Sequence, residues 1–262
     1  MKKIIKTAKV FLSTYYAYML EYRAELFLWL LSSSLPFIMM GIWTEATTQG
    51  EFPLDKLEFS RYFFAVFIVR SITPIWVIFD FESEVVEGKL SPKLLQPIDP
   101  VWHHIAGHIS ERFARGIFLV GLVLLFFVLY PQAFWFPNLG NFFLFLIVVL
   151  MAFVLRFLIQ YTLAMFAFWT ERASAIEQLF QLPYVFLSGV TAPLEVFPEL
   201  ALKIVVWTPF PYLVHFPASI LVGFPVDIGQ GLLVLLVWSA IFFGLNRWLW
   251  RLGLKQYSGM GA

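Results

Sequence analysis

The run GIFLVGLVLLFFVLYPQAFWFPNLGNFFLFLIVVLMAFVL, residues 116–155, contains no charged residue. About 20 helical residues cross the hydrocarbon core of a bilayer, so this run is too long for one crossing. Its middle is interrupted by the turn-forming residues Pro131, Pro137, Asn138 and Gly140. The run therefore predicts two membrane spans joined by a tight turn, and the second continues past Arg156 to about Trp169.

The composition of the whole chain agrees with a membrane protein. Of its 262 residues, 60% are hydrophobic and 13% are charged, with a mean hydropathy of +0.80. An ordinary soluble domain is about a quarter charged, so a soluble enzyme is excluded. The net charge of +1 gives no reason to expect a nucleic-acid partner, and the absence of cysteine excludes disulfides, thiolate catalysis and iron–sulfur clusters.

Four further apolar runs lie outside this central stretch, and the second of them carries a lone arginine, Arg70. With the two central spans they predict an all-α integral membrane protein with six transmembrane helices in a single domain, residues 1–262. The four runs are about Leu26 to Trp43, Tyr62 to Phe79, Ala175 to Leu194 and Ile228 to Asn246.

The positions of the positive charges predict the orientation. With the amino terminus in the cytoplasm, six spans return the carboxyl terminus there and leave only Lys56, Arg61 and Lys203 outside. This distribution follows the positive-inside rule. The apolar stretch from Ile204 to Val226 is broken by four prolines, so we interpret residues 195–227 as an outer re-entrant segment rather than a seventh span.

Two segments have the periodicity of amphipathic helices. In residues 1–23, Phe11, Tyr15 and Met19 share one face while lysines occupy the other, which predicts an interfacial helix rather than a signal peptide. In the second segment, Trp102 to Arg115, one face is polar.

The polar face of that second segment raises the question of a metal site. His104, His108 and Glu111 have a spacing that suits metal ligands, but Arg112 and Arg115 lie among them and repel a cation. We therefore expect this face to be solvated, with no metal bound.

Sites for enzymatic chemistry are missing from the sequence. The phosphate-binding pattern fails because Gly88-Lys89 is followed by Leu90, and no Gly-x-Ser-x-Gly nucleophile motif occurs. The chain is therefore not expected to be an ATPase or a hydrolase.

Two arginines, Arg70 and Arg156, lie near the middle of predicted spans. Such cations are costly in a bilayer unless they face protein, water or a partner. Two interpretations stay open: they line a substrate pathway for an anionic group, or they lock helices together through carbonyls or a carboxylate such as Glu177.

The segment after the second span, residues 80–100, mixes acids with apolar residues on the cytoplasmic side. Such a mixture is typical of a docking surface for a soluble partner, although the segment could instead fold back onto the protein. A second cytoplasmic turn carries Glu171 and Arg172 and could assist the same partner.

Three motifs appear in order on this layout: EGKLSPKLLQPIDP at residues 87–100, LSGVTAPLEVFP at 187–198 and PFPY at 209–212. In this order the chain resembles the permease subunit of type-2 ABC exporters, in the six-span bacterial branch of mostly unassigned substrate. The resemblance covers nearly the whole chain.

The resemblance implies an exporter in the bacterial inner membrane, in contact with membrane lipid. Two permease subunits, the same or different chains, would dock on cytoplasmic P-loop ATPase subunits, and ATP and Mg would bind there and not in this chain. Residues 80–115 would form a cytoplasmic coupling loop and amphipathic helix. The implied coupling interface comprises Glu84, Val85, Glu87, Gly88, Leu90, Pro92, Leu94, Leu95, Pro97, Glu171 and Arg172. The implied outer re-entrant residues are Gly189, Pro193, Pro198, Pro209 and Pro211.

Two rival functions remain. A passive channel or membrane scaffold would also present amphipathic helices and intramembrane arginines, but would work without ATP. A membrane enzyme acting on lipids would need convergent acid, base or metal groups, for which the sequence offers only His104, His108 and Glu111.

Overall fold

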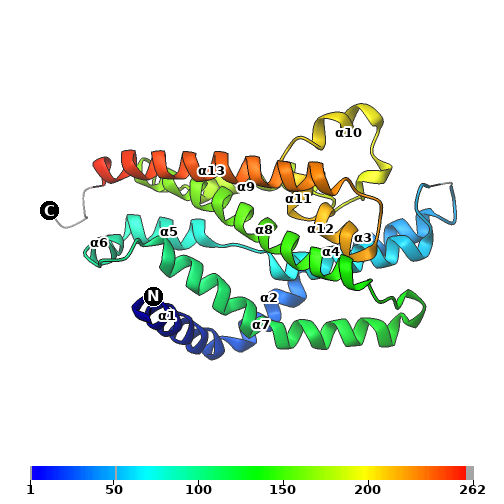
Figure 1. Cartoon of the computed structure of the whole chain (residues 1–262), viewed down its shortest axis with the longest axis horizontal. Helices are drawn as coiled ribbons and strands as arrows, with labels where there is room; N and C mark the ends of the chain where they lie inside the picture. Colours follow the sequence, from blue (N-terminus) through cyan, green and yellow to red (C-terminus); the bar gives the residue numbers. More distant parts are fainter. Residues whose placement is uncertain (1, 51, 258–262) are drawn as a thin grey trace.

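The computed structural model describes residues 2–50 and 52–257, and within them the chain forms helices and no strand. Residue 1 of the expected interfacial helix and residues 258–262 lie outside the described part. The helices run mostly along the long axis of the molecule (Figure 1). One end carries α6 (Leu90–Leu94), the start of α1 (Lys2–Glu21) and the end of α13 (Ile228–Gln256), and we name it the α6 end. The other carries α10 (Glu199–Val205) and the loop after α7 (Val101–Leu129), and we name it the α10 end.

Among the described residues, five helical stretches are long and apolar enough to cross a membrane. This confirms an α-helical membrane protein. The stretches are Arg23–Ala46, made of α2 (Arg23–Ser32) and α3 (Leu35–Ala46); Lys56–Val86, made of α4 (Lys56–Ile72) and α5 (Val77–Val86); α7; Leu139–Phe168, made of α8 (Leu139–Ala164) and the 3₁₀ turn η2 (Met165–Phe168); and α13.

The first two stretches are interrupted, which the sequence analysis did not anticipate. The first breaks just before Pro36, and the second breaks over residues 73–76, which contain Pro74. A proline removes a backbone donor and clashes with the preceding turn, so a helix ends near it. The break at residues 73–76 exposes backbone carbonyls in the middle of the chain's second crossing.

The structure also differs at the expected surface helix Trp102 to Arg115. This segment is the first half of α7, which continues without a break into the third span. The expectation that its polar face is solvated is wrong, because His104, His108, Glu111 and Arg115 are all buried. The physical reason is that this face lies against α5 and α8, where Glu84 and the Phe81 ring lie beside His104 and the Phe157 ring lies beside His108.

The core is centred on α4 and α8. In Lys56–Val86, 67% of the most apolar window is buried, against 17% in α7 and in α13. Aromatic rings fill the space around α4: Phe64 stacks on Phe126 with ring centroids 3.8 Å apart. The outer helices therefore leave much of their apolar surface for lipid or a partner.

The fifth expected span, Ala175 to Leu194, is shorter in the structure. Helix α9 (Ser174–Leu187) has 14 residues and is about 21 Å long at 1.5 Å per residue. It ends before Gly189, whose φ of +90° is a left-handed conformation that favours glycine. The chain continues through η3 (Leu194–Val196), α10, α11 (Phe210–Leu213) and α12 (His215–Val222).

Helices α8 and α13 lie side by side and run in the same direction. Thr162 in α8 donates a hydrogen bond to the carbonyl of Phe242 in α13, and Gly253 packs directly against the ring of Phe168 at the α6 end. Between the end of α8 and the start of α13, the chain must therefore return from the α6 end to the α10 end. Helix α9 and the broken segment that follows it make this return (Figure 1).

Candidate functional site

The segment of residues 80–100 folds partly against the protein itself. Phe81 and Val85 of α5 and Leu90 of α6 are buried in a hydrophobic cluster at the α6 end. The resemblance places Val85 and Leu90 at the coupling interface, but in the structure both side chains pack inside the protein. Their apolar character did not reveal whether they face the protein or a partner.

The same segment presents an exposed face, which we name the coupling surface: Glu87, Lys89, Pro92, Leu95, Gln96 and Pro97. Leu95 is 88% exposed, an unusual position for a large aliphatic side chain on a folded surface. Gly88 has a φ of +72° and turns the chain between α5 and α6. A hydrogen bond from Lys89 lowers the pKa of Glu87, so this carboxyl group is ionised at neutral pH.

A carboxylate that the sequence analysis did not single out connects α5 to α9. The Oε2 atom of Glu82 accepts a hydrogen bond of 2.6 Å from the backbone N–H of Ser174, and its Oε1 accepts one of 3.0 Å from the Ser174 hydroxyl. A carboxylate at the first turn of a helix satisfies a free backbone donor and suits the helix dipole. Glu171 and Arg172 lie exposed just before this junction.

Two further contacts join the segment to α13. The hydroxyl groups of Ser91 and Tyr257 are 2.9 Å apart, and Arg247 forms an ion pair of 2.7 Å with Asp99. Leu94 is half-buried and packs against the same hydrophobic cluster. These contacts connect residues 80–100 to α9 and α13.

Glu84 faces inward rather than toward the coupling surface. Its carboxylate is 2.5 Å from the Lys93 ammonium group and 3.5 Å from Nε2 of His104. Glu84 therefore holds α5, α6 and α7 together.

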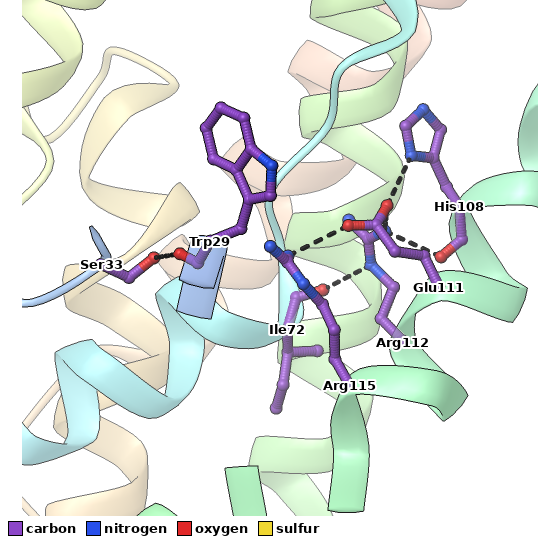
Figure 2. Close-up of polar contacts among 7 residues, drawn as sticks. All are labelled: Trp29, Ser33, Ile72, His108, Glu111, Arg112 and Arg115. Atoms are coloured by element: carbon purple, nitrogen blue, oxygen red, sulfur yellow. Dashed lines mark hydrogen bonds and ion pairs between the residues drawn. The ribbon is translucent and has the colours of Figure 1, made fainter. Parts of the chain in front are cut away.

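A cluster of charges lies where α7 passes the break between α4 and α5 (Figure 2). Glu111 contacts Arg115 at 3.1 Å, Arg112 at 3.0 Å and Nδ1 of His108 at 3.5 Å. Arg112 also donates a hydrogen bond of 2.9 Å from Nε to the carbonyl of Ile72, near the end of α4. The break leaves carbonyls at the end of α4 without a helical N–H donor, and the Arg112 guanidinium group donates to one of them.

Arg156 is buried between α8 and α9. It donates a hydrogen bond of 2.7 Å to the Tyr184 hydroxyl, and its guanidinium carbon lies 4.4 Å from the centroid of that ring. One turn further along α8, Gln160 donates a hydrogen bond of 2.5 Å to Glu177. These contacts are the kind expected of helix locking, although the partner, Tyr184, was not among the expected ones.

Arg70 is half-buried at the end of α4, close to the break in the second stretch. Its Nη1 atom is shielded from solvent and forms no hydrogen bond with any residue in 2–50 or 52–257. A buried donor of this kind is available to a ligand or a partner group.

The segment between α9 and α13 is held against α4 by a tyrosine and a histidine. The Tyr62 hydroxyl donates a hydrogen bond of 2.8 Å to the carbonyl of Gly189 and lies 3.0 Å from Nδ1 of His215. The backbone N–H of His215 donates to the carbonyl of Ser188. The prolines mark starts of short helices: Pro193 precedes η3, Pro198 precedes α10, Pro209 precedes α11 and Pro211 lies in its first turn.

Metal ligands are not brought together anywhere in the part of the chain that the structure describes, where no group of three or more His, Asp or Glu side chains is placed to hold an ion. In particular, His108 and Glu111 pair with each other, and His104 pairs with Glu84.

Comparison with known proteins assigns the family. The family model described as "ABC-2 family transporter protein" matches residues 42–261, which include all the long helices after the first, the coupling surface and the segment between α9 and α13. The chain therefore belongs to the ABC-2 transporter family, and the resemblance seen in the sequence motifs is confirmed. It is a permease subunit and an integral membrane protein. No curated protein matches the chain.

Proposed function

We propose that this chain is the membrane-spanning permease of an ATP-driven exporter in the bacterial inner membrane, with both termini in the cytoplasm. Five long helices and the return path through α9 give six passes, and this count agrees with the start of α1 and the end of α13 lying at the same end of the molecule (Figure 1). The segment between α9 and α13 would be the outer re-entrant segment.

The observation that carries this proposal is the exposed coupling surface in a chain of the ABC-2 transporter family. Leu95 and its charged neighbours offer an apolar anchor with a polar rim, which is the usual composition of a protein interface. A cytoplasmic ATPase that binds ATP and Mg would dock there and against Glu171 and Arg172. Its closure would move α5 directly, and α9 and α13 through Glu82, Ser91 and Asp99.

Two permease subunits, the same or different chains, would enclose the substrate pathway, with lipid around them. Arg70 is the better pathway residue of the two arginines: each has one buried nitrogen without a hydrogen bond, but the Arg156 guanidinium group already bonds the Tyr184 hydroxyl and lies over its ring. Only the ATPase supplies free energy, so the permease acts as a two-state element whose equilibrium the ATPase shifts.

The experiment is affinity purification of the chain from its native membrane in mild detergent, followed by mass spectrometry and an ATP hydrolysis assay. We expect a P-loop ATPase with vanadate-sensitive activity to copurify, and the substitution Leu95→Asp to abolish its recovery. The matched control is Phe136→Asp, because Phe136 is an exposed apolar residue of the loop at the α10 end. Purification of the chain without any ATPase would instead favour a passive channel or scaffold.

A further inference from the structure

A large cleft opens between α1, α2, α5 and α7 in the half of the molecule that carries the α6 end. Its volume is about 900 Å³, at the upper end of the range of pockets that hold drug-sized ligands. Charged groups and aromatic side chains both line it, so it has the character of a site for a molecule with a polar group and an apolar body.

Each lysine and arginine that lines the cleft is paired with a carboxylate, and Glu111 is shared between Arg115 and Arg112. Lys93 pairs with Glu84, and Arg115 pairs with Glu111. Lys89, at the rim, pairs with Glu87. These positive charges are therefore poor partners for an anionic ligand, which would have to compete with carboxylates already in place.

Two carboxylates that line the cleft have no such partner. Asp80 of α5 and Glu25 of α2 are exposed, and neither forms a hydrogen bond or an ion pair with another residue that the structure describes. The charge that the cleft offers to a ligand is therefore negative.

The walls beside these carboxylates are aromatic. The rings of Trp29 and Trp76 lie 5.3 Å apart, those of Tyr18 and Tyr22 lie 5.0 Å apart, and all four rings are exposed. The faces of aromatic rings carry negative potential and attract ammonium and other organic cations, most strongly when the cation is shielded from water. The rings therefore reinforce the preference set by Asp80 and Glu25.

A buried histidine provides a separate observation. His108 lines the cleft and is only 5% exposed. Its Nδ1 faces the Glu111 carboxylate at 3.5 Å, which favours a proton on that nitrogen (Figure 2). Its Nε2 forms no hydrogen bond with residues 2–50 or 52–257 and is left as an acceptor. Such a buried acceptor suits an N–H donor of a ligand.

We propose that this cleft binds an amphiphilic organic cation, held by Asp80 and Glu25 and by the aromatic walls. The proposal rests on the proposed function in one respect, since it makes such a cation the cargo that the permease receives from the inner side. Binding itself requires neither ATP nor the ATPase, so it is tested on the full chain alone.

The test uses two probes of nearly the same size and shape but opposite charge, tetraphenylphosphonium and tetraphenylborate. Binding of each radiolabelled probe is measured on the full chain in phosphatidylcholine nanodiscs, and binding to empty nanodiscs is subtracted. We expect the phosphonium ion to bind at least tenfold more tightly than the borate ion. Equal binding, or tighter binding of the borate ion, would overturn the proposal.

Variants then assign the binding to this cleft. Asp80→Asn should weaken phosphonium binding about fivefold, and the double variant with Glu25→Gln should weaken it further. Glu199→Gln is the matched control, because Glu199 is an exposed carboxylate at the α10 end. Unchanged binding in the double variant would contradict the site even if the wild type selects the cation.

The outcomes separate this inference from the proposed function. Selective binding that depends on Asp80, in a chain that recovers no ATPase, would support the cation site and contradict the proposed transporter function. Recovery of the ATPase with no charge-selective binding would support the transporter function and contradict a cation site in the cleft.

Discussion

The α6 end and the segment between α9 and α13 differ in the contacts that hold them together. At the α6 end, segments are joined by single polar contacts between side chains, such as Asp99 with Arg247 and Glu82 with Ser174. The α6 end also contains close packing, with Gly253 against the Phe168 ring, and in the segment between α9 and α13 Gly189 is pressed against Tyr62 and His215. Polar contacts near water exchange partners at little cost, whereas a close-packed core has few alternative arrangements. We therefore expect the segments that these polar contacts join at the α6 end to move more readily than the packed segment around Gly189.

The largest effect is expected in the packed segment around Gly189. A Cβ at residue 189 would lie 2.7 Å from the His215 Cβ and even closer to the Tyr62 hydroxyl, at a φ that disfavours any side chain. Gly189→Ala should therefore lower the free energy of unfolding by about 3 kcal/mol, measured by denaturation in mixed detergent micelles. Gly121→Ala is the control, since a Cβ there meets nothing within 4 Å. Similar stabilities for the two variants would mean that the segment around Gly189 is not tightly packed.

The next effect concerns the contact between α8 and α9. Arg156→Met removes the hydrogen bond to Tyr184 and leaves that hydroxyl and the nearby Glu177 without the cation, so the free energy of unfolding should fall by about 2 kcal/mol. Arg251→Met, at an exposed position, should be close to neutral. If Arg156→Met instead leaves stability unchanged but reduces transport, Arg156 belongs to the substrate pathway rather than to helix packing.

A smaller effect is expected at the junction of α5 and α9. Glu82→Ala removes the acceptor for the first turn of α9 and should cost about 1 kcal/mol. It should also reduce the stimulation of ATP hydrolysis by substrate, because α9 would no longer follow α5. The control Glu199→Ala removes an exposed carboxylate of α10, outside the coupling surface and away from the first turn of α9. Equal stimulation in the two variants would show that this junction does not transmit motion.

The smallest effect on stability is expected for Leu95→Asp, because the side chain is already exposed. Its free energy of unfolding should stay within about 0.5 kcal/mol of the wild type, while the ATPase is lost from the complex. Leu94→Asp is the matching variant at the next position. Because Leu94 packs against the hydrophobic cluster at the α6 end, Leu94→Asp should also lower the free energy of unfolding below that of the wild type. A stable Leu94→Asp protein and an unstable Leu95→Asp protein would reverse the assignment of these two neighbours.

Much of the fold follows from properties that the sequence carries locally. Uncharged runs predict the long helices, and the order of the Gly and Pro motifs predicts the family. The prolines also mark where the chain is irregular between α9 and α13. The shortening of α9 has a local signal too, since Gly189 comes shortly before Pro193.

The rest depends on which surfaces meet, which periodicity does not reveal. The pattern in Trp102 to Arg115 shows that His108 and Glu111 share a face, but not that side chains of α5 and α8 lie against it. Likewise, some apolar side chains in the segment 80–100 lie in the core and others lie on the coupling surface. The contact of Glu82 with Ser174 joins residues far apart in the chain, so no local pattern predicts it.

Docking of an ATPase on the coupling surface can be tested by cross-linking. The chain contains no cysteine, so Leu95→Cys introduces a single thiol at the coupling surface, and Phe136→Cys introduces one at the α10 end. A bifunctional thiol- and amine-reactive reagent is applied to native membranes, and the products are identified by mass spectrometry. We expect a cross-link from residue 95, but not from residue 136, to a P-loop ATPase. Absence of any ATPase product from residue 95, with both thiols shown to be reactive, would contradict it.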